Sequence, residues 1–121
     1  MLSASQLAEF TITNPPKVGL SRKDNVQKRY DDFLKDPENS RRFIERMTDE
    51  LKDKKYILLD NTFPYNVEEG IEHKVCWFKD CDMIKLINEL KSKMDVITCW
   101  RNIPENCSIP AIKHLHVFVR L

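Results

Sequence analysis

Glycine is nearly absent from this chain, at two of its 121 residues. The sequence contains neither of the glycine-rich phosphate-binding patterns G-x-x-x-x-G-K-[ST] and G-x-G-x-x-G, and no G-x-S-x-G nucleophile elbow. Such loops need glycine wherever the backbone approaches a phosphate closely or turns sharply. The composition therefore argues strongly against a glycine-cradled nucleotide site.

The chain also has no strong excess of charge and no long apolar run. Twenty basic and nineteen acidic residues give a formal net charge of +1, which offers no electrostatic reason to expect nucleic acid or an anionic membrane as a partner. No apolar run approaches the roughly 18 residues that span a bilayer. Residues 1–16 show no secretory signal. We therefore expect a soluble cytoplasmic protein without nucleic-acid or membrane partners.

The cysteine pattern does not match a usual zinc site. The four cysteines are Cys76, Cys81, Cys99 and Cys107. Their spacings, C-x4-C and C-x7-C, differ from paired C-x2-C clips, and in the cytoplasm we expect these thiols to be reduced. A zinc site that combines Cys76 with His73 and His116 is the least favoured alternative. A divalent metal on the histidines alone stays open.

The order of the patterns predicts an α+β fold in a single domain, residues 1–121. Residues 1–23 read as an irregular N-terminal arm because of Pro15, Pro16 and Gly19. Amphipathic helices are predicted to begin with Asp24 as cap, at Pro37 after an Asp36 cap, and within residues 80–93. Strands are predicted over 55–60, 71–78, 95–102 and 114–121. The fold is therefore N-terminal helices followed by a small mixed or antiparallel sheet of about four strands, with a helix between strands two and three.

In this arrangement we expect the helices to pack on one face of the sheet. The helix over 80–93 should turn its apolar side toward that sheet. The residues expected inside are Met83, Ile84, Ile87 and Leu90.

The last strand carries two of the three histidines, in the stretch KHLHVFVRL. Side chains alternate along a strand, so His114, His116, Phe118 and Arg120 share one face. The two histidines are then about 7 Å apart, and their imidazoles can converge on a metal ion, a phosphate or a carboxylate. Arg120 could add a guanidinium fork for an anion. The alternative is a solvated polar face without a function.

The third histidine, His73, shares a strand face with Val75 and Trp77. If this strand neighbours the last one, His73 completes a three-histidine site. Alternatively, His73 packs beside Trp77 with its nitrogens bonded to the backbone.

Two stiff loops, 61–70 and 100–110, lead into and out of these strands. They carry prolines and aromatic residues, and they include Tyr65, Trp100 and Asn102. Such loops can form the wall of a small-molecule pocket, or they can simply cover the end of a sheet.

Three stretches of the chain, 12–30, 61–78 and 100–120, together resemble a family of unknown function. The family is found mainly in fungi and in some large DNA viruses, and some members are labelled N-acetylglucosamine-induced protein. The matching residues are Asn14, Leu20, Arg22, Tyr30, Phe63, Pro64, Tyr65, Gly70, His73 and Trp77, followed by the His-x-His-Val strand. One departure is that Ile103 separates Asn102 from Pro104, where the family runs Asn-Pro directly. The resemblance implies that all three histidines belong to one shared site.

Two functions follow from these patterns, and whether the protein is an enzyme stays open. The first is a histidine-lined pocket for a small anionic or phosphorylated ligand, with hydrolysis as its reaction. Its residues are His73, His114 and His116 as catalytic groups, with Arg22, Tyr65, Trp77, Trp100, Asn102 and Arg120 as ligand contacts. A histidine-triad nucleotide hydrolase fits poorly, because Phe118 stands at the third histidine position. The second function is a non-enzymatic protein–protein contact through exposed Tyr65, Trp77 and Trp100, with a host factor as partner if the source is viral.

Overall fold

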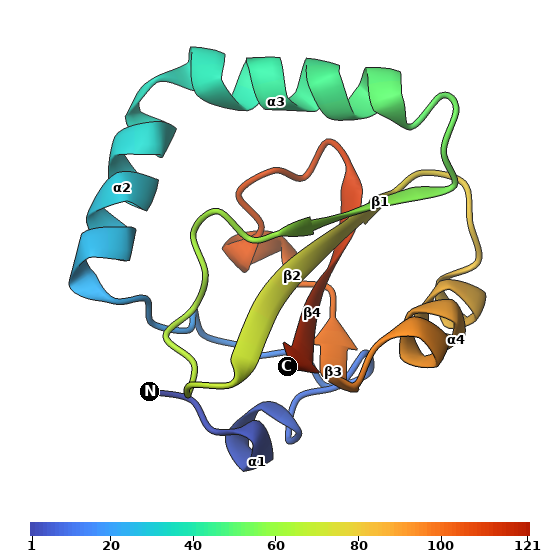
Figure 1. Cartoon of the computed structure of the whole chain (residues 1–121). Helices are drawn as coiled ribbons and strands as arrows, with labels where there is room; N and C mark the ends of the chain where they lie inside the picture. Colours follow the sequence, from blue (N-terminus) through green and yellow to red (C-terminus); the bar gives the residue numbers. More distant parts are fainter.

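The computed structural model describes residues 1–121 and contains one four-stranded sheet (Figure 1). Its strands are β1 (Tyr56–Asp60), β2 (Ile71–Phe78), β3 (Val96–Trp100) and β4 (Lys113–Arg120). They lie in the order β1-β2-β4-β3, and every neighbouring pair is antiparallel. The predicted α+β fold is therefore confirmed. Of the two predicted kinds of sheet, mixed or antiparallel, the structure has the antiparallel one.

Four α-helices and one short 3-10 helix complete the fold. They are α1 (Ala4–Leu7), α2 (Asp24–Lys35), α3 (Pro37–Glu50), α4 (Met83–Lys93) and η1 (Pro104–Asn106). Figure 1 shows α2 and α3 framing one side of the sheet, with α4 on the opposite side. None of these helices has the length and apolar character that a membrane crossing requires.

The helix starts follow from short polar residues in the sequence. The Asp36 carboxylate accepts a hydrogen bond from the backbone N–H of Glu38, and Pro37 occupies the first position of α3, as predicted. Asp82 caps α4 in the same way. The cap of α2 differs from the prediction, because Lys23 holds that position and Asp24 lies in the first turn.

Helices cover both faces of the sheet, and not one face as we expected. On one face Cys76, Leu115 and Val117 pack against Leu86 and Leu90 of α4. The opposite face packs against the end of α3 in one part and against α1 in another. Its buried residues there are Val75, Trp77, Met47 and Leu51 near α3, and Phe118, Trp100, Tyr65 and Leu7 near α1. The reason lies in β4, whose six residues from His114 to Val119 are all buried, so both of its faces need cover.

The N-terminal arm contains one helix that we did not predict. Ser3 and Gln6 form a capping box at α1, and Leu7 beyond it is fully buried. Leu2 forms a parallel bridge with Val67, which ties the arm to the loop before β2. The Ser-x-x-Gln spacing was the sequence signal for this helix.

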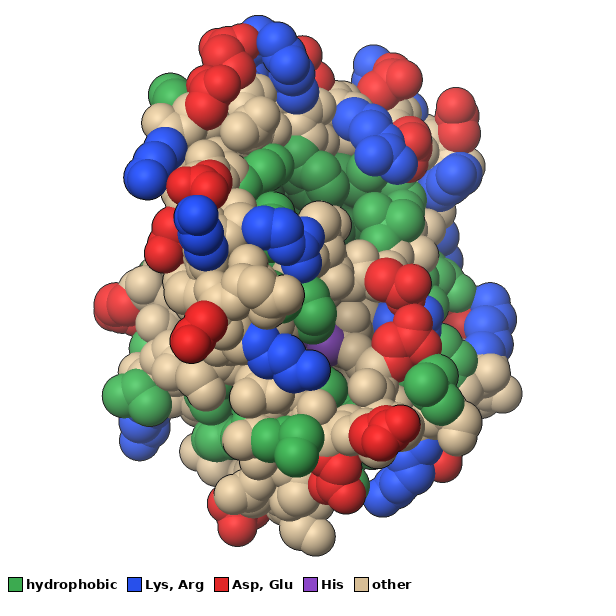
Figure 2. Space-filling model, turned by 60° about the vertical axis from the view of Figure 1, so that its left-hand side comes forward, with side chains coloured by type: hydrophobic (Ala, Val, Ile, Leu, Met, Phe, Trp, Pro, Cys, Tyr) green, Lys and Arg blue, Asp and Glu red, His purple; other side chains and the backbone are tan.

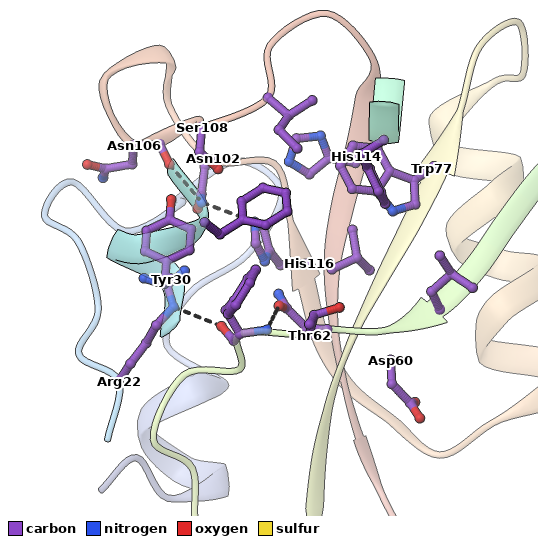
Figure 3. A pocket seen from close by; sticks show the side chains of 17 residues that line it. Arg22, Tyr30, Asp60, Thr62, Trp77, Asn102, Asn106, Ser108, His114 and His116 are labelled. Carbon is purple, nitrogen blue, oxygen red and sulfur yellow. Dashed lines mark hydrogen bonds between the residues drawn. The ribbon is translucent and has the colours of Figure 1, made fainter. Parts of the chain in front are cut away.

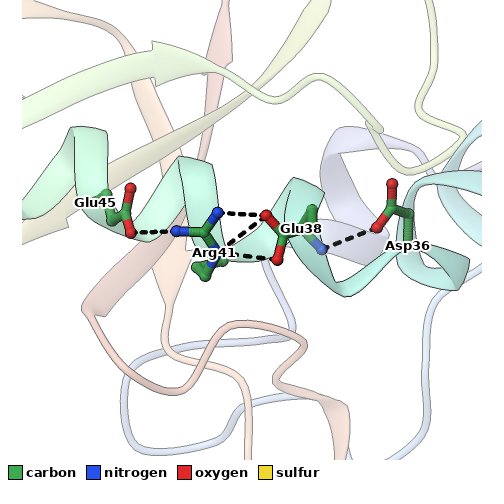
Figure 4. A network of polar contacts seen from close by, with 4 residues as sticks. All are labelled: Asp36, Glu38, Arg41 and Glu45. Carbon is green, nitrogen blue, oxygen red and sulfur yellow. Dashed lines mark hydrogen bonds and ion pairs between the residues drawn. The ribbon is translucent and has the colours of Figure 1, made fainter.

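The outer side of α3 carries a line of ion pairs (Figure 4). Arg41 contacts Glu38 one turn before it, and its Nη1 lies 2.6 Å from an oxygen of Glu45 one turn after it. Exposed pairs of this kind contribute little to folding stability. They keep the outer face of α3 polar while its inner face packs on the sheet.

The predicted inner side of α4 is confirmed at Met83, Ile87 and Leu90 and is wrong at Ile84. Leu86, Ile87 and Leu90 are buried, whereas Ile84 is 59% exposed. Ile84 and Leu86 lie at the two borders of the apolar side of α4, so the pattern alone did not decide which of them faces the sheet.

A pair of substitutions on α4 tests this orientation. We expect Leu86→Ala to lower the free energy of unfolding by about 2–5 kcal/mol, because it opens a cavity in the core. The matched control Ile84→Ala should change it by less than about 1 kcal/mol, because the side chain is largely exposed. Urea denaturation measures both values. Equal losses in the two variants would contradict the observed packing of α4.

Candidate functional site

A cavity of about 190 Å³ lies between the histidine-bearing face of the sheet and the two helices α2 and α3 (Figure 3). Figure 2, which brings the α2 side of the molecule forward, shows hydrophobic side chains lining a hollow with charged groups around it. The floor of the cavity is formed by β2 and β4, and its aromatic wall includes Tyr30, Phe33 and Phe43. The loops that follow β1 and β3 contribute Asn61 and Asn102. The cavity is therefore mainly aromatic, with a few polar groups at fixed positions.

The sheet register brings the three histidines together. Strands β2 and β4 are neighbours, with Val75 opposite His116 and His73 opposite Phe118. His73 is therefore diagonal to His116, and its Nε2 lies 2.8 Å from His116 Nδ1. The rings of His114 and His116 are 5.6 Å apart at their centroids. The predicted adjacency of the two histidine strands is confirmed.

His73 lies below the cavity and does not line it. Its side chain is 3% exposed, and its ring stacks on Phe118 at 4.3 Å, whereas we considered Trp77 as its neighbour. The backbone N–H of Tyr65 donates to His73 Nδ1 at 3.1 Å. A nitrogen that accepts this bond carries no hydrogen, so the neutral His73 ring is protonated on Nε2.

His116 and Asn102 both line the cavity and lie beside each other. The distance from His116 Nε2 to Asn102 Nδ2 is 3.0 Å. Two fixed partners orient the amide of Asn102. Trp100 Nε1–H donates to its oxygen at 2.9 Å, and the carbonyl of Asn106 accepts from its nitrogen at 3.3 Å. The amino group of Asn102 therefore faces His116.

His114 has the opposite tautomer. The carbonyl of Ile112 can only accept, so the hydrogen in its 3.0 Å contact belongs to His114 Nδ1. Nε2 of His114 then carries a free lone pair. The ring packs against Trp77 at an interplanar angle of 34°, with the ring centroids 4.3 Å apart, and both residues line the cavity (Figure 3). His114 thus offers the cavity a hydrogen-bond acceptor and a base.

Burial keeps all three imidazoles uncharged at neutral pH. It lowers the pKa of His114, lowers that of His73 well below the ordinary value, and lowers that of His116 to about 3. The nearby guanidinium of Arg22 lowers the pKa values of His73 and His116 further. The histidines therefore act as neutral donors and acceptors and not as cations.

Arg22 is the only cationic side chain that lines the cavity, and it has no carboxylate partner. Its Nε donates to the carbonyl of Phe63 at 2.8 Å, and its guanidinium lies over the rings of Tyr30 and Tyr65 at 4.0 and 4.9 Å. Figure 3 places Arg22 and Tyr30 at one end of the cavity and His114 at the other.

The single acidic residue of the cavity wall is already neutralised. Asp60 lies 2.6 Å from Lys74, and this hydrogen bond is the main reason why its pKa is lowered. The free charge of the cavity is therefore the positive charge of Arg22.

The remaining predicted site residues lie in the cavity wall, beneath the cavity or outside it. Trp77 lines the cavity, whereas Tyr65 and Trp100 lie beneath it and hold Asn102 through hydrogen bonds. Arg120 lies outside the cavity, at the end of β4, and pairs with Asp95 at 3.5 Å. The aromatic residues that we expected to be exposed are buried, at 7% for Tyr65, 6% for Trp77 and 0% for Trp100.

The sequence reasoning missed the residues that the helices supply to the cavity wall. Tyr30, Phe33 and Phe43 belong to the apolar sides of α2 and α3, which we took for core packing alone. Asn61 was missed as well. The side-chain oxygen of Asn61 accepts a hydrogen bond from the N–H of Phe63, which forms an Asx-turn. An asparagine directly after a strand was the available sequence signal for this turn.

The histidine cluster does not form a metal centre. No three side chains of His, Cys, Asp or Glu come close enough to hold an ion together. Cys76, which we weighed as a zinc ligand, faces α4 on the other side of the sheet, and all four cysteines are free. A metal-bound histidine donates its second N–H to an acceptor, whereas the second nitrogen of His73 meets the N–H of Tyr65. This donor arrangement does not fit a metal on the His73–His116 pair.

Comparisons with known proteins show the fold and nothing further. No family model matches the chain, and no curated protein matches it. The crystal structure of a protein named HTC1 is similar, with a TM-score of 0.61 and 21% sequence identity, over 84% of this chain and 76% of that one. At this identity the likeness concerns the arrangement of helices and strands.

The lowered histidine pKa values predict that the free energy of unfolding already falls between about pH 6.5 and 5, before carboxyl groups are protonated. In the unfolded chain His116 is protonated below about pH 6.5, whereas the folded protein keeps it neutral down to about pH 3. The unfolded state then binds more protons, so stability falls as the pH falls through this window. Between pH 6 and 5 we expect a loss of about 1 kcal/mol for His116 alone.

Urea denaturation at pH 7, 6 and 5 measures this loss, with His116→Gln as the comparison. The variant should lose about 1 kcal/mol less than the wild type between pH 6 and 5. The same loss in both proteins would mean that His116 is not held neutral by the fold.

Proposed function

We propose that the cavity binds a small anionic ligand with an apolar or aromatic body. One observation carries this proposal: Arg22, a half-buried cation without a carboxylate partner, lies in the wall of a cavity lined mainly by aromatic and aliphatic groups. A cation in such a place favours an anion because the low surrounding polarity strengthens their attraction.

The shape and lining of the cavity support the apolar part of the ligand. A volume of about 190 Å³ suits a small molecule. Phe33, Phe43 and Trp77 offer ring faces and edges against which a flat apolar body can pack. Arg22 at one end of the cavity and His114 at the other then fix the polar ends of such a ligand (Figure 3).

A hydrolytic reaction at this site would use His114 as its general base. The Ile112 carbonyl holds the His114 ring with the Nε2 lone pair free, and the neutral form of the ring is the one that accepts a proton. His73 would act only through His116, because it does not line the cavity. In this version His73 is a positioning residue and not a catalytic one.

A protein–protein contact is the second proposal, and it has less support because Tyr65, Trp77 and Trp100 are buried. We also propose a cytoplasmic location, which the four free cysteines support.

Kinship with the fungal and viral family of unknown function remains a proposal. Its support is that the histidines of the shared motifs come together in one cluster.

Binding of three small probes tests this function. The probes are phenylacetate, phenyl phosphate and the neutral 2-phenylethanol, titrated into the 15N-labelled protein and followed by NMR. We expect at least one anion to bind more tightly than the alcohol and to shift signals of the cavity wall. Arg22→Gln should weaken that anion by about 10- to 100-fold, the effect of one charge-assisted hydrogen bond.

Arg42→Gln serves as the matched control, because Arg42 is an exposed residue of α3 without an ion pair. It should leave the affinities unchanged. Failure of both anions to bind the wild type, or equal affinity for the alcohol, would overturn the proposed function.

A further inference from the structure

A chain of polar contacts runs through His73 and His116, and at each of its two ends lies an N–H group that can only donate. At one end the backbone N–H of Tyr65 donates to His73 Nδ1 at 3.1 Å. At the other, Trp100 Nε1–H donates to the oxygen of Asn102, which turns the amino group of Asn102 toward His116 Nε2 at 3.0 Å. Between these ends, His73 Nε2 and His116 Nδ1 share one contact of 2.8 Å.

This chain of contacts contains more N–H groups than acceptors. Asn61 is part of it, because its oxygen accepts from the N–H of Phe63 and its amino group lies 3.3 Å from His73 Nε2. A neutral imidazole carries one hydrogen, so His73, which accepts on Nδ1, donates from Nε2. That hydrogen fills the 2.8 Å contact and makes His116 Nδ1 an acceptor. The hydrogen of His116 is then on Nε2, where it meets the amino group of Asn102, donor against donor.

The hydrogen without an acceptor lies on His116 Nε2, next to the cavity, and not in the buried contact between His73 and His116. The other placement would put two hydrogens into the 2.8 Å contact between His73 and His116, where His73 is 3% exposed and the other polar neighbour of its Nε2, the amino group of Asn61 at 3.3 Å, is a donor as well. His116 and Asn102, in contrast, both line the cavity. An acceptor atom that enters the cavity there receives the His116 Nε2–H, which has no acceptor in the protein. It competes with Tyr65 Oη at 3.2 Å and the Asn106 carbonyl at 3.3 Å for a hydrogen of the Asn102 amino group.

We infer that the oxygen acceptor of the ligand is a monocarboxylate, held between His116 Nε2–H and the amino group of Asn102, with the charge of Arg22 balancing it. This inference rests on the proposed function, since it describes the same cavity. Two neutral donors beside a guanidinium form a site for one oxyanion. Recognition is then set by the tautomer of His116 and not by a charge on it.

The charge balance of the cavity favours a carboxylate over a phosphate monoester. Arg22 supplies one positive charge, and the only acidic wall residue, Asp60, is paired with Lys74. A carboxylate matches this with one negative charge, whereas a phosphate monoester carries about −1.5 to −2 at neutral pH. The excess charge of the phosphate would lose its hydration in the cavity without a counterion.

Asn102→Asp tests the inference by placing a carboxylate in the wall itself. One of its oxygens can keep the hydrogen bond from Trp100, and the other can accept the His116 Nε2–H that is offered to the ligand. We expect phenylacetate to bind the variant at least about tenfold more weakly than the wild type. The neutral 2-phenylethanol should keep its affinity, because the apolar part of the cavity is unchanged.

Asn88→Asp is the matched control, since it makes the same chemical change on the exposed side of α4. It should leave phenylacetate binding as in the wild type. In the wild type itself, phenylacetate should bind more tightly than phenyl phosphate.

A second measurement needs no variant and covers the case in which Asn102→Asp does not fold. The Nε2–H proton of His116 is followed by NMR in wild-type protein with a 15N-labelled ring. Phenylacetate should move this proton strongly downfield, as expected for a new hydrogen bond to a carboxylate. The ring signals of His114 should not show a new N–H proton.

The outcomes separate this inference from the proposed function. If neither anion binds the wild type, both fail. If anions bind in an Arg22-dependent way but phenyl phosphate equals phenylacetate, or the His116 proton does not move, only the carboxylate inference fails. Unchanged phenylacetate binding in a folded Asn102→Asp variant would overturn it as well.

Discussion

The hydrogen bond from the backbone N–H of Tyr65 to His73 decides the protonation pattern of the whole cluster. A backbone amide can only donate, so it leaves His73 with its hydrogen on Nε2. Through the 2.8 Å contact that hydrogen decides where His116 carries its own. The pattern depends on burial, because a charged imidazole would carry hydrogens on both nitrogens. The lowered pKa values of the buried rings keep this order at neutral pH.

The fold creates this arrangement by burying both faces of its two central strands. Helix α4 packs on one face of these strands, and the buried residues of that contact are apolar. The other face carries the histidines, and its cover is aromatic and made of loops as well as helices. The cavity remains where α2 and α3 span this face without filling it (Figure 3). His73 stacks on Phe118 and His114 packs at a tilt against Trp77, which makes both imidazole rings part of the core.

Local patterns were enough to predict the strands and the shared face of the histidines. The alternation of side chains along a strand is a property of the backbone, so His114 and His116 had to point the same way. The pairing of β2 with β4 was a hypothesis that the register confirms. Caps such as Asp36 and Pro37 were readable because they act over a few residues.

What the sequence could not provide depends on contacts between distant segments. The partner of His73 is a backbone amide, which no residue type reveals. Arg120 pairs with Asp95 because the end of β4 lies beside the start of β3. The position of Ile84 on α4 was predicted wrongly, since Ile84 and Leu86 are equally apolar and only the packing distinguishes them. The burial of Trp100 likewise follows from its place next to His116 in the sheet.

The most direct test is to measure which ring nitrogens carry hydrogen, by 15N NMR of the histidine side chains at neutral pH. The account predicts three neutral rings, with His73 and His116 protonated on Nε2 and His114 on Nδ1. A doubly protonated ring in the cluster, or a His116 protonated on Nδ1, would contradict it.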